Sequence, residues 1–182
     1  MVGSCMYTMT QTRVDISFPI QWLTRGFQSP ITPHLHAAKN LIRYLNGSKT
    51  LAICYGRTFS GNTEVFDPKI PPLLVPKAFS DSDFAGDKAT SKSTYGYLIT
   101  IANGPVSWKS KRAAIIALST TEAETDALIE TIREVLWLKN LYKELKTPIK
   151  APINLKENNK GSIITAYNPA LHNRTKHTLL KF

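Results

Sequence analysis

The feature that most constrains the fold is a hairpin pattern followed directly by a long amphipathic helix. Residues 94–102 alternate large apolar side chains with small or polar ones, which is typical of a half-buried strand. Asn103 and Gly104 are a strong hairpin signal, and residues 105–108 supply the returning strand. We expect residues 114–118 to form a third short strand, so that these segments make an antiparallel meander.

The helix after the hairpin is predicted to run from Ser119 to about Leu145. Ser119 and Glu122 have capping-box spacing, with Ser119 as the N-cap and Glu122 reaching back to it. Glu124 lies one turn before Leu128 on the apolar stripe. A carboxylate on the buried face of a helix is costly unless it is paired or binds a metal. Glu124 is therefore a candidate functional residue, and the alternative is a surface residue with the stripe shifted by one position. The predicted stripe comprises Ala127, Leu128, Ile132, Val135, Leu138, Tyr142 and Leu145.

An acidic stretch precedes the hairpin. Residues 78–87 place three carboxylates, those of Asp81, Asp83 and Asp87, beside a short apolar run. A strand that ends in carboxylates can hold a divalent metal, because hard cations prefer oxygen ligands. Asp, Ser and Gly are also common turn formers, so a polar turn is the alternative interpretation.

The first part of the chain is predicted to be helical. Residues 3–47 carry apolar side chains at roughly helical spacing, with an interruption near residues 12–15 and a turn at residues 29–33. Gly47 is the expected helix stop. Residues 51–55 are short, apolar and bounded by breakers, which predicts a strand.

Residues 57–76 break these periodic patterns. Gly-Asn, Asp-Pro and Pro-Pro pairs interrupt the segment, which indicates a linker or an irregular loop. Further along, residues 153–156 are predicted to be a short strand and residues 162–167 a short helix. The predicted organisation is a helical segment at residues 1–56, a linker at residues 57–76 and an α/β (α+β) domain, a mixed sheet with packed helices, at residues 77–182.

The chain is basic and has few cysteines. It contains 23 Lys and Arg against 13 Asp and Glu, a formal net charge of +10, which favours a polyanionic partner such as nucleic acid. Cys5 and Cys54 are too few for a disulfide framework and are interpreted as buried free thiols in a reducing compartment. No segment has the pattern of a signal peptide or a membrane span. We therefore expect an intracellular protein with no membrane partner.

Five motifs, in the same order, resemble the ribonuclease H region of copia-type LTR retrotransposon Pol polyproteins. They are SDSDFAGD at residues 80–87, STYGY at 93–97, VSWKSK at 106–111, ALSTTEAE at 117–124 and NRTKH at 173–177. Upstream, residues 2–4, 12–16 and 34–47 are similar to the end of the reverse transcriptase, a thumb- or connection-like segment past the polymerase palm. The resemblance implies a ribonuclease H-like fold, incomplete at its C-terminus, and a nuclease that cuts RNA in RNA–DNA hybrids. It also implies the rest of the polyprotein as a partner, in cytoplasmic virus-like particles or in the nucleus.

The resemblance also implies a metal site. Members of the family use carboxylates to hold two Mg²⁺ ions about 4 Å apart. Asp81 matches the family's first-strand aspartate, Glu124 matches the helix glutamate, and this register leaves Asp83 and Asp87 as turn or supporting residues. Asn158 stands where the family has a third carboxylate. Glu157, one residue earlier, is the substitute ligand to consider, although neighbouring strand side chains point to opposite faces.

These departures predict that nuclease activity is impaired or lost. An amide at Asn158 removes a negative charge from a site that must hold two dications, and the fourth family carboxylate lies beyond the His motif, where this chain stops. The expected function is that of a truncated, degenerate remnant of the polyprotein. The alternative is a non-catalytic nucleic-acid-binding module. Its candidate contacts are Lys109, Lys111, Arg112, Arg174, Lys176 and His177.

Overall fold

The computed structural model describes residues 2–56, 58–60, 63–65, 75–149, 152–157, 159 and 163. The chain divides into two compact units, Met1–Cys54 and Tyr55–Phe182, and each is described by itself. Within the described residues, none of the helices combines the length and the apolar character that a membrane crossing requires.

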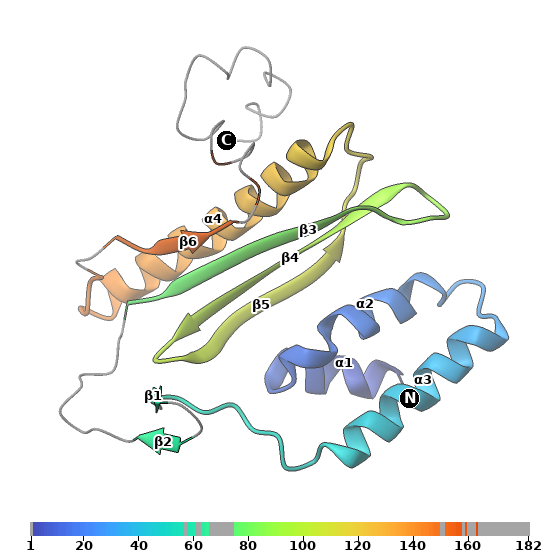
Figure 1. The fold of residues 1–182 in the computed structure, drawn as a ribbon, viewed down its shortest axis with the longest axis horizontal. Helices are drawn as coiled ribbons and strands as arrows, with labels where there is room; N and C mark the ends of the chain where they lie inside the picture. Colours follow the sequence, from blue (N-terminus) through green and yellow to red (C-terminus); the bar gives the residue numbers. More distant parts are fainter. Residues whose placement is uncertain are drawn as a thin grey trace. The chain divides into compact units, whose positions relative to one another are not determined.

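The first unit is helical, as predicted. Its elements are α1 (Val2–Gln11), the 3₁₀ turn η1 (Val14–Ile16), α2 (Ser17–Arg25) and α3 (Thr32–Gly47) (Figure 1). The break between α1 and α2 falls where the sequence predicts it, and α3 ends at Gly47. The buried core of this unit is formed by Cys5, Ile16, Ile20, Leu23, Ala38 and Leu41.

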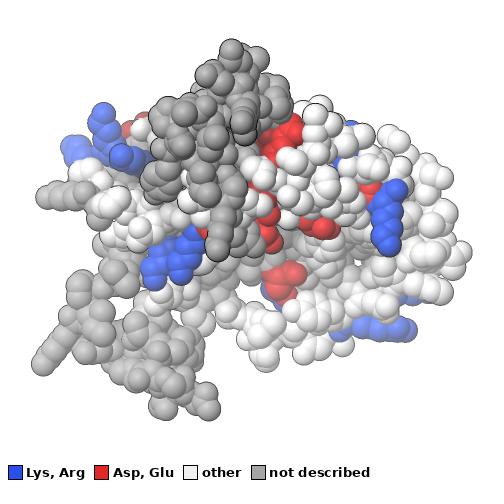
Figure 2. Space-filling model, turned by 45° about the horizontal axis from the view of Figure 1, so that its top comes forward, with Lys and Arg blue, Asp and Glu red and all other residues white. Residues whose placement is uncertain are grey.

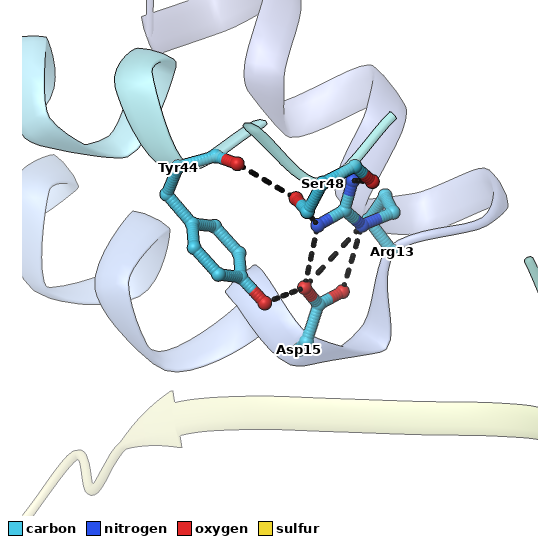
Figure 3. A network of polar contacts seen from close by, with 4 residues as sticks. All are labelled: Arg13, Asp15, Tyr44 and Ser48. Atoms are coloured by element: carbon cyan, nitrogen blue, oxygen red, sulfur yellow. Dashed lines mark hydrogen bonds and ion pairs between the residues drawn. The ribbon is translucent and has the colours of Figure 1, made fainter. Parts of the chain in front are cut away.

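A buried arginine holds the end of α3 against the segment between α1 and α2 (Figure 3). Arg13 is 7% exposed and donates from Nη2 to Asp15 Oδ2 at 2.7 Å and to Ser48 Oγ at 2.7 Å. The Tyr44 hydroxyl donates to the same Asp15 oxygen at 2.7 Å. The hydrogen bond from Arg13 is the largest of several effects that lower the pKa of Asp15 to about 2. This Arg13 network joins two segments that lie far apart in the sequence.

The predicted strand at residues 51–55 is wrong, because this segment has no regular secondary structure. No strand within the described part of the chain pairs with it. Hydrogen bonds from Tyr55 and Gly56 hold the chain at the end of this segment instead. The Tyr55 hydroxyl donates to the carbonyl of Pro105 at 2.9 Å, and the amide of Gly56 donates to Ala102 at 2.7 Å. Cys54 is consequently exposed, so the prediction of two buried thiols holds only for Cys5.

The second unit contains a four-stranded mixed sheet in the order β5-β4-β3-β6. Its strands are β3 (Lys77–Asp87), β4 (Lys92–Ile101), β5 (Gly104–Arg112) and β6 (Asn154–Lys156). β3, β4 and β5 are antiparallel neighbours, whereas β6 pairs in parallel with β3. Helix α4 (Thr120–Glu144) lies along one face of the sheet (Figure 1). This arrangement confirms the predicted mixed α/β class.

The predicted linker contains a small hairpin of its own. β1 (Thr58–Ser60) and β2 (Thr63–Val65) pair antiparallel, with Phe59 opposite Glu64. The description of residues 57–76 as wholly irregular is therefore wrong for these two short strands. Residues 66–74 lie outside the described part of the chain.

The predicted hairpin between β4 and β5 is confirmed, with its turn one residue earlier than expected. Ile101 pairs with Gly104, so Ala102 and Asn103 are the two central turn residues. Their φ angles are 49° and 64°, and a type I′ turn requires positive φ at both positions. Gly104 therefore begins β5 instead of occupying the turn.

The predicted strand at residues 114–118 is wrong, because the third strand of the meander is β5 itself. β5 ends at Arg112. Beyond it, the Ala113 amide donates to the carbonyl of Ser93 at 2.8 Å, and Lys92 Nζ donates to the carbonyl of Ala114 at 2.6 Å. The segment that follows is irregular and leaves Ile115, Ile116 and Leu118 exposed. Apolar side chains alone suggested a strand there, but a strand also needs a pairing partner.

Helix α4 begins as predicted. The Oγ of Ser119 accepts a hydrogen bond from the amide of Glu122 at 3.1 Å, which confirms the N-cap. The Glu122 carboxylate reaches back one residue further than expected, to the amide of Leu118 at 2.8 Å. Leu145 is 62% exposed because it lies just past the last helical residue, so its assignment to the buried stripe is wrong. The core between α4 and the sheet comprises Ala78, Ile99 and Leu138, with Tyr97, Val135 and Leu155 packed against them.

Candidate functional site

Glu124 lies near the start of α4 and is only 7% exposed, as its position on the apolar stripe predicts. Its Oε2 atom is buried and accepts no hydrogen bond. The pKa of Glu124 is raised to about 7, chiefly by burial and then by the charges of Glu157 and Asp81, while hydrogen bonding with Ser82 acts in the opposite direction. A carboxylate in this environment holds a proton near neutral pH unless a cation compensates its charge.

Asp81 lies on β3, where it pairs with Gly96 of β4, and its side chain is exposed. Ala78 and Ser80 are buried beneath α4, so alternation along β3 places the side chain of Asp81 on the opposite face of the sheet. The charge of Asp81 raises the pKa of Glu124, so the two carboxylates lie within electrostatic range of each other. This electrostatic effect links the two residues that were expected to bind metal, and their role as ligands stays a prediction.

Glu157 comes directly after β6, and the fold places it on the same side of the sheet as Glu124. In the parallel pairing of β6 with β3, Leu155 lies opposite Ala78, and Leu155 packs into the core beneath α4. Because side chains alternate along a strand, Glu157 shares this face with Leu155. Its charge raises the pKa of Glu124 more than that of Asp81 does. Alternation therefore places Glu157 on the side of the sheet that α4 covers, and its role as a substitute ligand stays a prediction. Asn158 lies outside the described residues.

Asp83 and Asp87 support the end of β3 and the turn that follows. Asp87 pairs with Arg112 at 2.7 Å, and its Oδ1 accepts a hydrogen bond from the Ala89 amide at 3.2 Å. The carboxylate of Asp83 fills the space where a Cβ atom at Gly86 would lie. An alanine at position 86 would therefore displace Asp83.

Two of the predicted nucleic-acid contacts on β5 are engaged by acidic residues. Lys109 Nζ lies 3.2 Å from Glu130 Oε2, and Arg112 pairs with Asp87. Lys111 is exposed. Figure 2 shows exposed Lys and Arg side chains in blue and Asp and Glu side chains in red among the described residues. The remaining predicted contacts, Arg174, Lys176 and His177, lie outside the described residues.

The fit to a metal ion is partial. A buried carboxylate oxygen without a hydrogen bond, with two further carboxylates in electrostatic range, suits a hard cation. Within the described part of the chain, however, no three His, Cys, Asp or Glu side chains are close enough together to hold a metal ion. The residues therefore fit a cation through Glu124 and its neighbours, but not the full carboxylate set of a two-metal site.

The Arg13 network was not predicted as a unit. Its members occur in two of the segments that suggested the resemblance, residues 12–16 and 34–47, but neither segment alone indicates that Arg13 is buried. A buried arginine needs a carboxylate partner, so the nearby Asp15 was the available signal.

The second unit is thus a mixed α/β domain in which one helix covers a face of a four-stranded sheet, and a buried carboxylate near the start of that helix is affected by the charges of Glu157 and Asp81. Comparison with known proteins identifies relatives of the whole chain. The chain is 36% identical over 181 residues to the retrovirus-related Pol polyprotein from transposon TNT 1-94 of Nicotiana tabacum, which is 100% of this chain and 12% of that protein. It is 34% identical over 181 residues to the corresponding polyprotein from transposon RE1 of Arabidopsis thaliana, which is 100% of this chain and 11% of that protein. The chain therefore spans only a small part of these relatives.

The chain also resembles the secreted RxLR effector protein 161 of Plasmopara viticola, with 36% identity over 137 residues, 75% of this chain and 87% of that protein. Its homologues thus include retrovirus-related Pol polyproteins of transposons. The predicted relationship to a Pol polyprotein is thereby confirmed. No family model matches the chain, and no solved structure gives a significant match.

Proposed function

We propose that the second unit is a ribonuclease H-like module of a copia-type Pol polyprotein and that its nuclease activity is impaired or lost. The observation that carries this proposal is the buried carboxylate of Glu124 near the start of α4, whose pKa is raised by burial and by the charges of Glu157 and Asp81. The strand order supports it: three antiparallel strands, a helix and then a strand parallel to the first of them make up the core expected of a ribonuclease H-like domain. The helical first unit is proposed to be the end of the reverse transcriptase.

Asp81 and Glu124 would hold Mg²⁺ in this module. A bound divalent metal activates water and stabilises the leaving oxygen in hydrolysis of a phosphodiester. Glu124 would offer its unpartnered Oε2, and Asp81 would offer a carboxylate accessible from solvent. Asn158 supplies an amide in place of a carboxylate, which lowers the negative charge available to a second dication. Impaired activity follows from this deficit.

The proposed substrate is an RNA–DNA hybrid. A net charge of +10 favours binding to a phosphate backbone through counterion release. Because Lys109 and Arg112 already pair with acidic residues, the contribution of β5 would come chiefly from Lys111. The same charge supports the second candidate function, a non-catalytic nucleic-acid-binding module. Binding that loses affinity steeply with added salt is expected in both cases, whereas a flat salt dependence would exclude both.

Cleavage of a labelled RNA–DNA hybrid tests the proposed loss of nuclease activity. Purified protein with Mg²⁺ or Mn²⁺ is expected to release little or no product, and Asp81→Asn should remove what remains. Glu144→Gln is the matched control, because Glu144 is an exposed carboxylate at the far end of the same helix. Strong cleavage that depends on Asp81 would contradict the proposed impairment. Cleavage that survives both Asp81→Asn and Glu124→Gln would contradict the proposed site.

A further inference from the structure

A pocket of about 430 Å³ lies between β4, α4 and the irregular segment that follows β5. We call it the Tyr95 pocket. Its lining includes Tyr95 of β4, Ile115 beyond β5, and Asp126, Ile129, Glu130 and Arg133 of α4. Pockets of this size commonly hold small organic groups. Neither Asp81 nor Glu124 lines it, so it is distinct from the proposed metal site.

Tyr95 places a buried hydroxyl among the charged residues of this pocket. The residue is 8% exposed, and within the described part of the chain its hydroxyl makes no hydrogen bond. The pKa of Tyr95 is raised to about 12, chiefly by burial and then by the charges of Glu130 and Asp126, while Arg133 acts in the opposite direction. These three side chains line the pocket, so the hydroxyl lies at its wall. The phenol stays protonated at neutral pH and can donate a hydrogen bond to a ligand.

The charged groups of the Tyr95 pocket balance one another. Glu130 pairs with Arg133 at 2.9 Å and with Lys109 at 3.2 Å, and Asp126 adds a second carboxylate. Two carboxylates thus accompany two cations, so a cationic ligand gains little net attraction. A carboxylate offers about four lone pairs, so Glu130 can accept further hydrogen bonds while its ion pairs persist. The pocket therefore suits a neutral group that carries several N–H donors.

Further cations lie beside the pocket. Lys111 is exposed and lies opposite Tyr95 in the pairing of β5 with β4, so the two side chains share a face of the sheet. Lys92 Nζ lies 2.6 Å from the carbonyl of Ala114, which is another lining residue. The side chain of Arg133 is 60% exposed. Exposed cations at the edge of a neutral pocket favour an anionic group such as a phosphate.

A guanine nucleotide has the matching arrangement of groups. Guanine carries N1–H and an N2 amino group side by side on one edge, where they can donate together to a carboxylate such as Asp126. Its O6 and N7 atoms accept hydrogen bonds, which suits the Tyr95 hydroxyl and the Arg133 guanidinium. The flat faces of the ring suit the apolar side chains of Ile115 and Ile129. Adenine fits less well, because its N1 atom is an acceptor and would face a carboxylate.

We propose that the Tyr95 pocket binds a guanosine monophosphate group, with Asp126 and Glu130 accepting from the base and Lys111 near the phosphate. This group can come from a free nucleotide or from an unpaired guanosine in RNA. The inference goes beyond the proposed nuclease function and does not depend on it, because its residues lie outside the proposed metal site.

Calorimetric titration of the full chain with GMP tests the proposal. Saturable binding is expected, and IMP, which lacks the N2 amino group, should bind about tenfold more weakly. AMP should bind more weakly than GMP, and guanosine, which lacks the phosphate, should bind with less dependence on salt. Asp126→Asn should weaken GMP binding about tenfold, and Tyr95→Phe, which removes only the hydroxyl, about threefold to tenfold. Glu144→Gln is the control and should bind GMP as the wild type does.

The outcomes separate this inference from the nuclease proposal. Absence of saturable GMP binding by the wild type overturns it, as does equal affinity for GMP and AMP. Wild-type affinity for GMP in both Asp126→Asn and Tyr95→Phe, each shown to be folded by circular dichroism, also overturns it. If Asp126→Asn does not fold, the comparison of GMP with IMP on the wild type decides the role of the carboxylate.

Short oligouridine RNAs with one central guanosine or one central adenosine distinguish the two sources of the ligand. Preference for the guanosine RNA, in addition to GMP binding, identifies an unpaired guanosine in RNA as a ligand. GMP binding without that preference identifies the free nucleotide. Cleavage of the RNA–DNA hybrid is a separate readout, so loss of GMP binding overturns this inference and leaves the proposed nuclease site standing.

Discussion

Replacing Glu124 with glutamine is predicted to stabilise the metal-free protein at alkaline pH. The pKa of Glu124 is raised from 4.5 to about 7 in the folded chain. A group with a raised pKa favours the folded state fully below its unfolded pKa, and this contribution is lost as pH rises through the folded pKa. The shift corresponds to an upper bound of about 3 kcal/mol at 1.36 kcal/mol per pKa unit. We expect about 1–3 kcal/mol, since the neighbouring Asp81 is exposed and solvent screens part of the repulsion.

Urea unfolding followed by circular dichroism measures this effect in the presence of a chelator. Glu124→Gln and the wild type should have nearly equal free energies of unfolding at about pH 4, and the variant should be the more stable at about pH 8.5. Glu144→Gln, which alters an exposed carboxylate of the same helix, should show no such pH dependence. A Glu124→Gln variant that is less stable than the wild type at alkaline pH would contradict the raised pKa of Glu124. So would a difference in the free energy of unfolding that does not change with pH.

Three further substitutions test the local structure. Asp15→Asn should destabilise the helical unit by about 1–3 kcal/mol near neutral pH, because it leaves the buried Arg13 without its carboxylate. The pKa of Asp15 is lowered from 3.8 to about 2, so this advantage of the wild type should disappear as pH falls through that range. Equal urea midpoints of Asp15→Asn and the wild type at pH 7 would contradict this prediction. Ala102→Gly should stabilise the second unit by about 0.5–1 kcal/mol, because glycine adopts the positive φ of the β4–β5 turn more readily. A urea midpoint below that of the wild type would count against the assigned turn. Ser119→Ala should cost about 1 kcal/mol through loss of the N-cap, while Ser119→Gly should cost less, and an unchanged Ser119→Ala midpoint would show that the cap contributes nothing.

The parts of the fold that were predicted correctly depend on patterns within short segments. The alternation in residues 94–102 and the turn after it define β4, β5 and their hairpin. The spacing of Ser119 and Glu122 marks the start of α4, and the helical period places Glu124 on its buried face. In each case the pattern lies within a few turns or one strand pair, so local physics was sufficient.

The errors arose where the outcome depends on a partner that is distant in the sequence. Residues 51–55 and 114–118 have apolar composition but no strand to pair with among the described residues. The position of Glu157 depends on the register of β6 against β3, which residues 153–156 alone do not specify. The burial of Arg13 likewise depends on Ser48 and Tyr44 from the end of α3. Register and long-range pairing, not propensity, decided these cases.

We propose that this chain carries a ribonuclease H-like carboxylate site weakened by an amide at one ligand position, Asn158. The most direct measurement is cleavage of an RNA–DNA hybrid by Asn158→Asp, compared with the wild type and with the double variant Asp81→Asn/Asn158→Asp in Mn²⁺. We expect Asn158→Asp to cut the RNA strand clearly faster than the wild type and the double variant to be inactive. Cleavage by Asn158→Asp that is no faster than that of the double variant would show that residue 158 is not a ligand position.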